Sequence, residues 1–369
     1  MSSNQDERPR VAIIGGGLAG CSTAIHVAAL RPDLVGQLEI LERARFPRDK
    51  PCGGGLTGLA IGILRSFDPE ILETGVVEVR NVLLVSGEIL RPVRLRQPMA
   101  VVHRRDLDQK VARVATARGV ELTQGVTAQK VISESNAVKV HAEKTRSVTA
   151  LIGADGARSV VRPSVSVKRG GLARLIEVVT PDRMDQPAEL RSTIVFDFSA
   201  TRHGLQGYTW RFPCEVDGVL CINWGIFDSR IYENAPRADL PALLDEFMTS
   251  HDYPTVRGDW VSHPVRRFDP DDHFSAPNVF LIGDAAGVDP ALGEGISLAL
   301  DYGDLAAHCV IDAFDRNDFS FATFRDQLFS HPVGQSLLTR HQMALQLYRP
   351  GSHNNEAALA IMEHWLESA

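Results

Sequence analysis

The sequence predicts an α/β protein with two lobes, in which a parallel β-sheet covered by helices is joined to an antiparallel β-sheet and a helical tail. Residues 11–42 are typical of a strand, a glycine-rich turn, a helix and a second strand. Residues 165–265 hold long strand candidates with little helix, which indicates an antiparallel sheet. Residues 316–369 contain three short helical stretches separated near Pro332 and Pro350. The first pattern predicts a doubly wound lobe, and the second predicts a separate lobe.

The first strand leads into a turn with three regularly spaced glycines. Val11 to Ile14 form a short apolar run typical of a buried parallel strand, and Gly15, Gly17 and Gly20 then follow the pattern G-x-G-x-x-G. The first glycine permits a tight turn, the second lets the backbone approach a diphosphate, and the third lets the helix pack closely on the strand. Free N–H groups at the helix start would face the phosphates. The sequence therefore predicts a Rossmann-like dinucleotide site.

An acidic residue, Glu42, ends the second strand about 20 residues beyond the last glycine. A carboxylate in that place can accept hydrogen bonds from the two hydroxyls of a ribose. It would repel an added 2′-phosphate, so the site favours FAD or NAD over their 2′-phosphorylated relatives. Arg43 stands beside it and is included in the predicted cofactor set.

Composition narrows the classes of partner. The formal net charge is -7 with no block of like charges, which argues against nucleic acid. The polar first ten residues and the interrupted apolar run after them predict neither a signal peptide nor a membrane span, so we expect a cytoplasmic protein, with contact to a membrane surface left open. The five cysteines lack metal-ligand spacing, so no metal site is predicted. A hairpin turn at Asp217-Gly218 would set Cys214 opposite Cys221, and we expect two free thiols there.

Further glycine-rich segments follow the nucleotide motif. Cys52, Gly53 and Gly54 belong to an irregular loop after the second strand, where glycines would let the backbone approach a flat ligand; a flexible solvent loop is the alternative. A strand also ends in Gly-Asp at Asp284, and the helix that begins after Gly295 has a partial positive charge at its start. The other predicted cofactor contacts are Arg104, Val126, Asp155, Asp284, Gly293 and Gly295; a surface arginine is the alternative for Arg104 and a helix-capping aspartate for Asp284.

Changes of pattern along the chain predict that the nucleotide lobe is assembled from three separate segments. The predicted boundaries are 1–80, 101–164 and 266–315 for the nucleotide lobe, 81–100 and 165–265 for the substrate sheet, and 316–369 for the helical tail. The absence of a second G-x-G-x-x-G pattern argues against a separate nicotinamide domain.

Three motifs in order, GGGLAG, GADGARS and IGDAAG, resemble the glutathione-reductase-type FAD fold shared with para-hydroxybenzoate hydroxylase. The resemblance covers nearly the whole chain and implies non-covalent FAD. It implies that the first motif binds the ADP half of FAD, that Asp155 lies near the dinucleotide and that Asp284 contacts ribityl hydroxyls. Arg104, in an R-x-x-L-D helix start, would contact the FAD backbone. Electrons would come from NAD(P)H that docks transiently or from a partner reductase.

Within this superfamily the segments PCGGG, YTWRFP and GDAAGVDPALGEGI are similar to those of the geranylgeranyl reductase family, which uses reduced FAD to saturate isoprenoid double bonds. The resemblance implies that Cys52 lies near the flavin ring. Its aromatic motif implies a substrate wall made of Tyr208, Trp210, Phe212 and Pro213. The double bond needs a proton as well as a hydride, and Cys52 or Tyr208 is the predicted catalytic donor. The alternative is that the aromatic motif is part of an ordinary hydrophobic core of the sheet.

Other reactions remain open at this point. The tail is shorter than a full prenyl-lipid reductase would need, so the substrate is expected to be small and apolar or aromatic. Similar proteins act as FAD-dependent monooxygenases on aromatic or secondary metabolites through a flavin hydroperoxide. A flavin-dependent halogenase is a weaker match, because Tyr208 and Phe212 depart from the halogenase W-x-W-x-I-P motif. An electron-transfer flavoprotein is the third class, and an enclosed cavity lined by Tyr208 and Trp210 would argue against it. The oligomeric state is not predicted.

Overall fold

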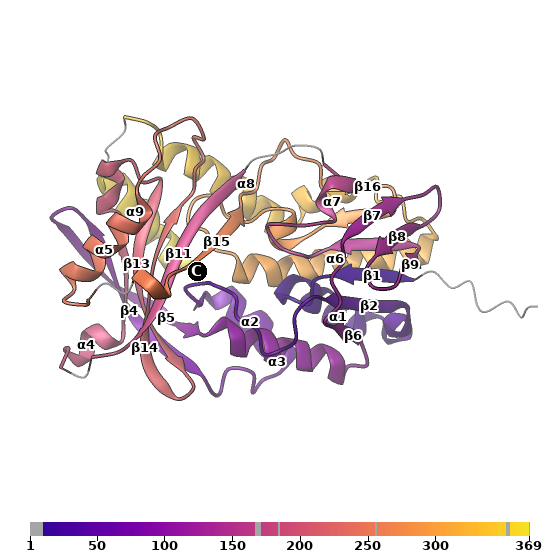
Figure 1. Ribbon diagram of the computed structural model, residues 1–369, viewed down its shortest axis with the longest axis horizontal. Helices are drawn as coiled ribbons and strands as arrows, with labels where there is room; N and C mark the ends of the chain where they lie inside the picture. Colours follow the sequence, from indigo (N-terminus) through magenta and orange to yellow (C-terminus); the bar gives the residue numbers. More distant parts are fainter. Residues whose placement is uncertain (1–9, 167–170, 184, 255–256, 352–354, 369) are drawn as a thin grey trace, which may run out of the picture.

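The computed structural model describes residues 10–166, 171–183, 185–254, 257–351 and 355–368. Two lobes lie side by side along the long axis, as Figure 1 shows, with the nucleotide lobe around β1 and the large sheet around β13. The predicted α/β fold with a second sheet and helices at the end of the chain is confirmed.

The nucleotide lobe is built on a six-stranded sheet with the order β16-β17-β10-β1-β2-β6. Its strands are β1 (Val11–Ile14), β2 (Leu38–Glu42), β6 (Glu121–Gln124), β10 (Ala150–Gly153), β16 (Ser275–Ala276) and β17 (Val279–Leu281). All neighbours are parallel except β16 and β17. Every residue of β1 is buried, as expected for a strand covered on both faces.

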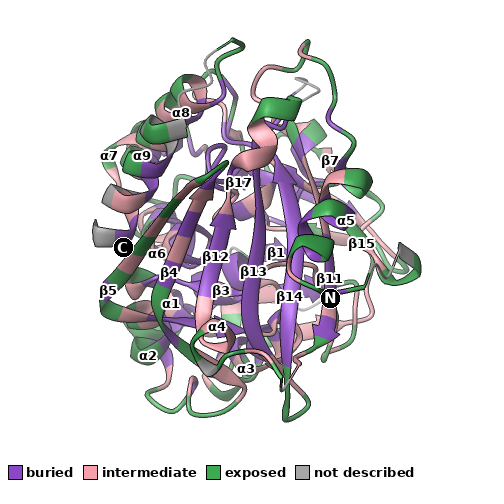
Figure 2. Cartoon of the chain, turned by 90° about the vertical axis from the view of Figure 1, so that its left-hand side faces the viewer, coloured by how far each residue is buried: buried purple, intermediate pink, exposed green. Residues whose placement is uncertain are grey.

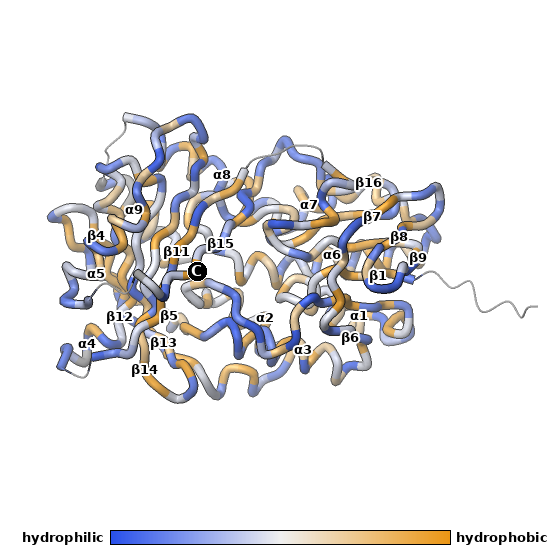
Figure 3. The backbone as a smooth tube through the Cα atoms, in the orientation of Figure 1, coloured by the Kyte–Doolittle hydropathy of each residue, from blue (hydrophilic) through white to orange (hydrophobic). Residues whose placement is uncertain are grey.

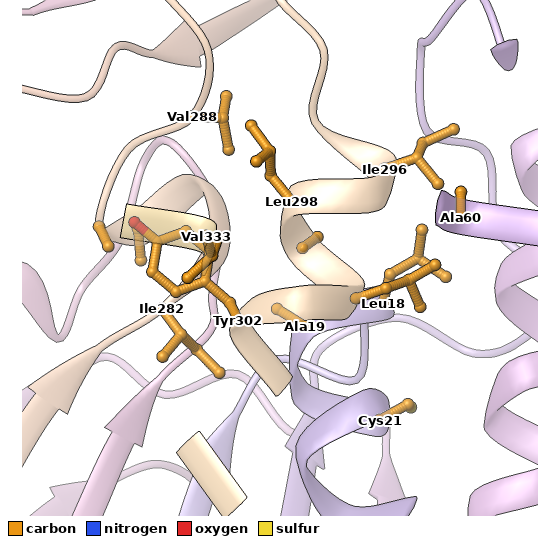
Figure 4. Close-up of a cluster of buried hydrophobic side chains, with 14 of the residues drawn as sticks. Leu18, Ala19, Cys21, Ala60, Ile282, Val288, Ile296, Leu298, Tyr302 and Val333 are labelled. Atoms are coloured by element: carbon orange, nitrogen blue, oxygen red, sulfur yellow. The ribbon is translucent and has the colours of Figure 1, made fainter. Parts of the chain in front are cut away.

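Helices from distant parts of the chain cover this sheet. The helices of the lobe are α1 (Leu18–Leu30), α2 (Gly58–Phe67), α3 (Arg104–Ala117) and α6 (Ile296–Arg316). In Figure 4, Ile296 of α6 lies near Ala60 of α2, and Leu298 of α6 lies near Val288; all four residues are buried. A small sheet of β7 (Lys130–Ser133), β8 (Val138–His141) and β9 (Arg146–Val148) completes the lobe.

The second lobe is an eight-stranded sheet with the order β15-β11-β14-β13-β12-β4-β5-β3. Its strands are β3 (Gly55–Leu56), β4 (Val76–Ser86), β5 (Ile89–Val102), β11 (Leu172–Pro181), β12 (Thr193–Asp197), β13 (Gly207–Val216), β14 (Val219–Asp228) and β15 (Val261–Arg266). The sheet is antiparallel except that β12 pairs with β4 in parallel, which differs from the expectation. The early strands also extend beyond the predicted segment 81–100 at both ends.

Helices α4 (Ala188–Arg191) and α5 (Leu240–Ser250) belong to this lobe, and α7 (Phe324–Ser330), α8 (Pro332–Leu347) and α9 (Asn355–Ser368) form the tail. Figure 2 shows that β13 and β14 are buried over most of their length, whereas exposed and half-buried residues alternate along much of β5 before its buried end. In Figure 3 the peripheral loops are mainly hydrophilic. None of the helices within the described ranges is both long and apolar enough to cross a bilayer.

The hairpin of β13 and β14 turns at Asp217 and Gly218, which both have positive φ. Cys214 pairs directly with Cys221 across it, and both thiols are free, as the sequence predicts.

Candidate active site

The turn after β1 has the geometry that a diphosphate requires. Gly15 has a φ of +106°, and a Cβ on Gly20 would lie 2.1 Å from the Gly15 carbonyl oxygen, so neither position has room for a side chain. Gly17 is the N-cap of α1, and no side chain caps that helix start. Arg48 reaches the same place, because a Cβ on Gly17 would lie 3.3 Å from Arg48 Nη2. The first turn of α1 therefore offers backbone donors beside a cation.

Glu42 lies at the end of β2, next to this turn. The residue is 4 % exposed, and its carboxylate accepts hydrogen bonds from Gly16 N at 2.8 Å and Ala44 N at 2.9 Å. The Glu42 carbonyl oxygen accepts from Val126 N at 3.0 Å, which brings Val126 to the same strand end. Arg43 is exposed. The structure thus places Glu42 and Val126 at the nucleotide turn, with Arg43 on the surface beside them.

A chain of buried charges runs from the nucleotide turn towards the large sheet. Arg104, at the start of α3, donates to Asp108 through Nε at 2.7 Å and Nη2 at 3.1 Å, and Arg48 Nη2 lies 3.1 Å from the same carboxylate. Further along, Lys50 Nζ lies 3.2 Å from Asp284 Oδ2. Burial alone would raise the pKa of Asp284, but Lys50 and Arg104 outweigh it and hold the pKa below its ordinary value. These cations suit an anionic ligand.

Asp155 follows the end of β10, beside Gly15. Its Oδ2 accepts hydrogen bonds from the N–H groups of Val160 at 2.6 Å and Val161 at 3.3 Å, so the side chain shapes the turn that follows. A Cβ on Gly15 would lie 2.3 Å from the carbonyl oxygen of Ala154, the residue that precedes Asp155. The structure therefore brings Asp155 to the first glycine motif.

A cavity lies between the glycine-rich loop and the large sheet. It contains about 670 Å³ of space free of protein atoms, counted to its open mouth. Of the predicted site residues, those that line it are Cys52, Gly53, Gly54, Tyr208, Trp210, Phe212, Gly293 and Gly295. Pro213 is not among the lining residues, which differs from the expectation. Side chains alternate across a strand, and Pro213 pairs with Ile222, which packs in a second cluster with Trp224.

Aromatic rings form one wall of this cavity. The ring centres of Tyr208 and Trp210 are 6.1 Å apart, and those of Trp210 and Phe212 are 6.2 Å apart. Phe196, on β12, meets Phe212 edge to face at 5.2 Å. Alternate residues of β13 thus present a continuous apolar surface to the cavity, because strand side chains repeat with period two.

Gly225, for which the sequence analysis predicts no role, makes this aromatic wall possible. It lies in the middle of β14 opposite Trp210, and a Cβ there would lie 2.1 Å from Trp210 Cζ2. The indole therefore lies across the backbone of β14. A glycine inside a predicted strand indicates such close approach, and this signal was present in the segment VLCINWGIF.

The hydroxyl of Tyr208 is hydrogen-bonded to the backbone. It donates to the carbonyl oxygen of Leu292 at 2.5 Å, and burial raises the pKa of Tyr208 well above its ordinary value. A phenol held in this way keeps its proton, so the structure favours a packing role for Tyr208 over the predicted proton transfer.

A buried polar cluster binds the main chain of the glycine-rich loop at Cys52. Asn223 Oδ1 accepts from Trp210 Nε1 at 2.7 Å, while Asn223 Nδ2 donates to the Cys52 carbonyl oxygen at 3.2 Å and to Glu177 Oε2 at 3.4 Å. Glu177 is 8 % exposed, and burial raises its pKa to about 7. Neither Glu177 nor Asn223 follows a local motif, so the sequence offered no signal for them.

The helical tail closes one side of the cavity. Helix α9 packs against β4 and β5, where Arg91 Nη1 lies 3.0 Å from Glu363 Oε2, and Trp365 of α9 lines the cavity. The Arg340 guanidinium of α8 lies 5.7 Å from the centre of the Trp365 ring and 3.0 Å from Glu294 Oε2. The tail is therefore part of the site, a placement that local sequence patterns do not contain.

Replacing Glu42 with alanine should raise the dissociation constant for FAD about 10- to 100-fold, because a charged acceptor for the ribose hydroxyls is lost. The measurement is a fluorescence titration of the cofactor-free protein with FAD. Glu39→Gln serves as the control: this residue lies on the same strand but pairs with Arg146 at 3.0 Å. An unchanged dissociation constant for Glu42→Ala would contradict the predicted role of Glu42.

Comparison with known proteins agrees with this geometry. The sequence profile described as FAD binding domain matches residues 8–305. A menaquinone reductase from Mycolicibacterium smegmatis is 29% identical over 336 residues, covering 81% of this chain and 76% of that protein. A digeranylgeranylglycerophospholipid reductase from Thermoplasma acidophilum is 27% identical over 333 residues, covering 84% of this chain and 80% of that protein.

Among solved structures, a geranylgeranyl bacteriochlorophyll reductase-like protein from Thermoplasma acidophilum shares the fold with a TM-score of 0.74 at 21% identity. The match covers 98% of this chain and 92% of that one. The predicted resemblance to geranylgeranyl reductases is thereby confirmed.

Proposed function

Because this chain belongs to the FAD binding domain family and is an FAD-dependent oxidoreductase, we propose that it reduces a carbon–carbon double bond of an apolar, isoprenoid-like substrate. The observation that carries the proposal is the aromatic cavity beside the loop of Cys52. Two relatives support the proposal: one is named a digeranylgeranylglycerophospholipid reductase and the other a menaquinone reductase.

The residues present fit FAD. The uncapped start of α1, the cation of Arg48 and the carboxylate of Glu42 supply donors for a diphosphate and an acceptor for a ribose. Asp284, held ionised by Lys50, would accept hydrogen bonds from a polyol chain. FAD, when bound and reduced, supplies the hydride. NAD(P)H that docks transiently, or a partner reductase, is the proposed source of electrons.

The cavity favours an uncharged substrate. Glu294 is the one charged residue among the described residues that line the cavity, and it is paired with Arg340. An alkene offers almost no polar contacts, so burial against Tyr208, Trp210 and Phe212 must hold it. An aromatic cavity lined by Tyr208 and Trp210 also argues against a protein that only passes electrons to a partner.

Cys52 is the proposed catalytic proton donor. It lines the cavity, and its Sγ accepts only a long contact of 3.5 Å from Gly54 N. The Tyr208 hydroxyl, in contrast, is bound to the Leu292 carbonyl oxygen. In this proposal Tyr208 shapes the wall, and the Cys52 thiol gives a proton to the double bond directly or through water.

The test is anaerobic photoreduction of the bound FAD followed by stopped-flow mixing with a prenylated alkene. Cys52→Ala should slow flavin reoxidation at least about tenfold, and Tyr208→Phe should have a smaller effect. Cys309→Ala, which removes a buried thiol of α6 outside the cavity, is the control.

Two results would contradict the proposal in different ways. Reoxidation at the wild-type rate in Cys52→Ala and Tyr208→Phe removes both residues as proton donors. No reoxidation by the alkene, together with a long-lived absorbance transient after mixing with oxygenated buffer, identifies a monooxygenase instead.

A further inference from the structure

We propose, resting on the reductase function above, that Glu177 is a proton-linked positioning residue: its carboxyl holds the amide of Asn223, which binds the main chain at Cys52, and its protonation state governs the cavity wall that they form with Trp210. Nothing in the proposed chemistry requires a carboxyl at this place, and the alternating pattern of β11 would accommodate an apolar residue there.

Strand register places Glu177 directly beside the cavity. Leu175 lines the cavity, and Glu177, two residues further along β11, faces the same side of the sheet. Opposite Glu177 stand Gly225 on β14 and Val261 on β15, neither of which competes for the carboxyl. Gly225 has no side chain, and the indole of Trp210, on the neighbouring strand β13, occupies the space that a Cβ would need.

The carboxyl of Glu177 reaches the Cys52 loop through Asn223. Asn223 Nδ2 donates to the carboxyl at 3.4 Å. Asn223 in turn binds the Cys52 carbonyl oxygen at 3.2 Å and Trp210 Nε1 at 2.7 Å. The carboxyl thus acts through Asn223 on the carbonyl group of Cys52 and on the orientation of one indole. A change of its charge changes the strength of all these hydrogen bonds together.

The charged neighbours of Glu177 are few. Arg104 of α3 acts on it from a distance, and Cys214 of β13 lies near enough to be affected by its charge. Within the described part of the chain no lysine, arginine or histidine lies within ion-pair distance of Glu177. A buried carboxyl without a cationic partner favours its neutral form, so protonation is accessible near neutral pH.

The test follows the indole N–H signal of Trp210 by NMR in the FAD-loaded, oxidised protein from about pH 5 to about pH 9. The signal is assigned with Trp210→Phe. We expect it to move between two plateaus with a midpoint near pH 7. Glu177→Gln imitates the neutral acid, so its signal should stay at the low-pH plateau throughout. Glu215→Gln, which removes a carboxyl of β13 from the opposite side of the sheet, should titrate like the wild type.

The same variants are compared in flavin reoxidation by the alkene. Glu177→Gln should match the wild-type rate within about twofold at low pH and differ from it by about fivefold or more above the midpoint. If Glu177→Gln does not fold, Glu177→Asp replaces it. The aspartate variant would keep the titration but shorten the reach to Asn223, so a smaller displacement of the indole signal with a preserved midpoint is expected.

A wild-type signal that does not move, or a Glu177→Gln signal that titrates as the wild type does, overturns the proposal. The NMR titration needs no substrate, so its failure leaves the reductase proposal standing. Conversely, a titration that is seen in a protein without reductase activity would leave Glu177 as the positioning residue of a flavoprotein with other chemistry.

Discussion

Replacing Gly54 with alanine is expected to lower alkene-dependent flavin reoxidation at least about 100-fold, because the loop would lose its place beside the cavity. Gly54 has a φ of +77°, and a Cβ would lie 1.9 Å from the carbonyl oxygen of Val102. That neighbour is backbone in β5 and cannot rotate away. The Gly54 carbonyl oxygen also accepts from Val102 N at 3.0 Å, so relief of the clash would break the pairing of the loop with the sheet.

The free energy of unfolding of Gly54→Ala should fall by about 2–4 kcal/mol, from the left-handed backbone and the lost pairing. Urea unfolding measures this change, and stopped-flow absorbance measures the rate. Gly62→Ala is the matched control, since Gly62 lies in α2 with nothing within 4 Å of its Cβ position, where alanine should be neutral or stabilising by up to about 1 kcal/mol. A Gly54→Ala enzyme that reduces alkene at the wild-type rate would contradict the proposed role of the loop.

The parts of the fold predicted from sequence are those whose causes are local. The turn of Gly15, Gly17 and Gly20 and the acid at the end of β2 all lie within about 30 residues, and each type of residue has a single geometric reason. The hairpin that pairs Cys214 with Cys221 follows from its Asp-Gly turn in the same way. Short-range geometry is therefore readable without the structure.

What the sequence could not supply depends on pairing across long distances. The parallel pairing of β12 with β4 joins segments more than 100 residues apart, and no periodicity encodes that choice. Glu177, Asn223 and Trp365 reach the site through strand register and the packing of α9, so they carry no motif of their own. Pro213 shows why a sequence motif alone does not identify the residues of a cavity wall. The aromatic motif runs along β13, whose successive side chains point to opposite faces of the sheet, so only some residues of the motif line the cavity.

Asp108→Asn is expected to destabilise the cofactor-free protein by about 3–5 kcal/mol, because it leaves two arginines without their shared carboxylate. The Asp108 side chain has no exposed surface and contacts both Arg104 and Arg48. Burial alone would raise the pKa of Asp108, but the two arginines outweigh it and hold the pKa below its ordinary value. Ionised Asp108 therefore stabilises the folded protein above an ordinary Asp pKa of about 3.9.

The dependence of this variant's unfolding free energy on pH and on FAD distinguishes a role of Arg104 and Arg48 in the fold from a role in cofactor binding. The difference in unfolding free energy from wild type should be full near neutral pH and narrow as pH falls below about 4, since the Asp108 carboxyl of the unfolded chain is then protonated. The native carboxyl, whose pKa is lowered, takes up its proton only at lower pH, where the difference is lost. Added FAD should reduce the difference, because its diphosphate supplies anions near the two arginines that have lost Asp108. Asp106→Asn, in the same helix turn, should change stability by less than about 1 kcal/mol. An equal loss with and without FAD would mean that Arg104 and Arg48 serve the fold alone and not the cofactor.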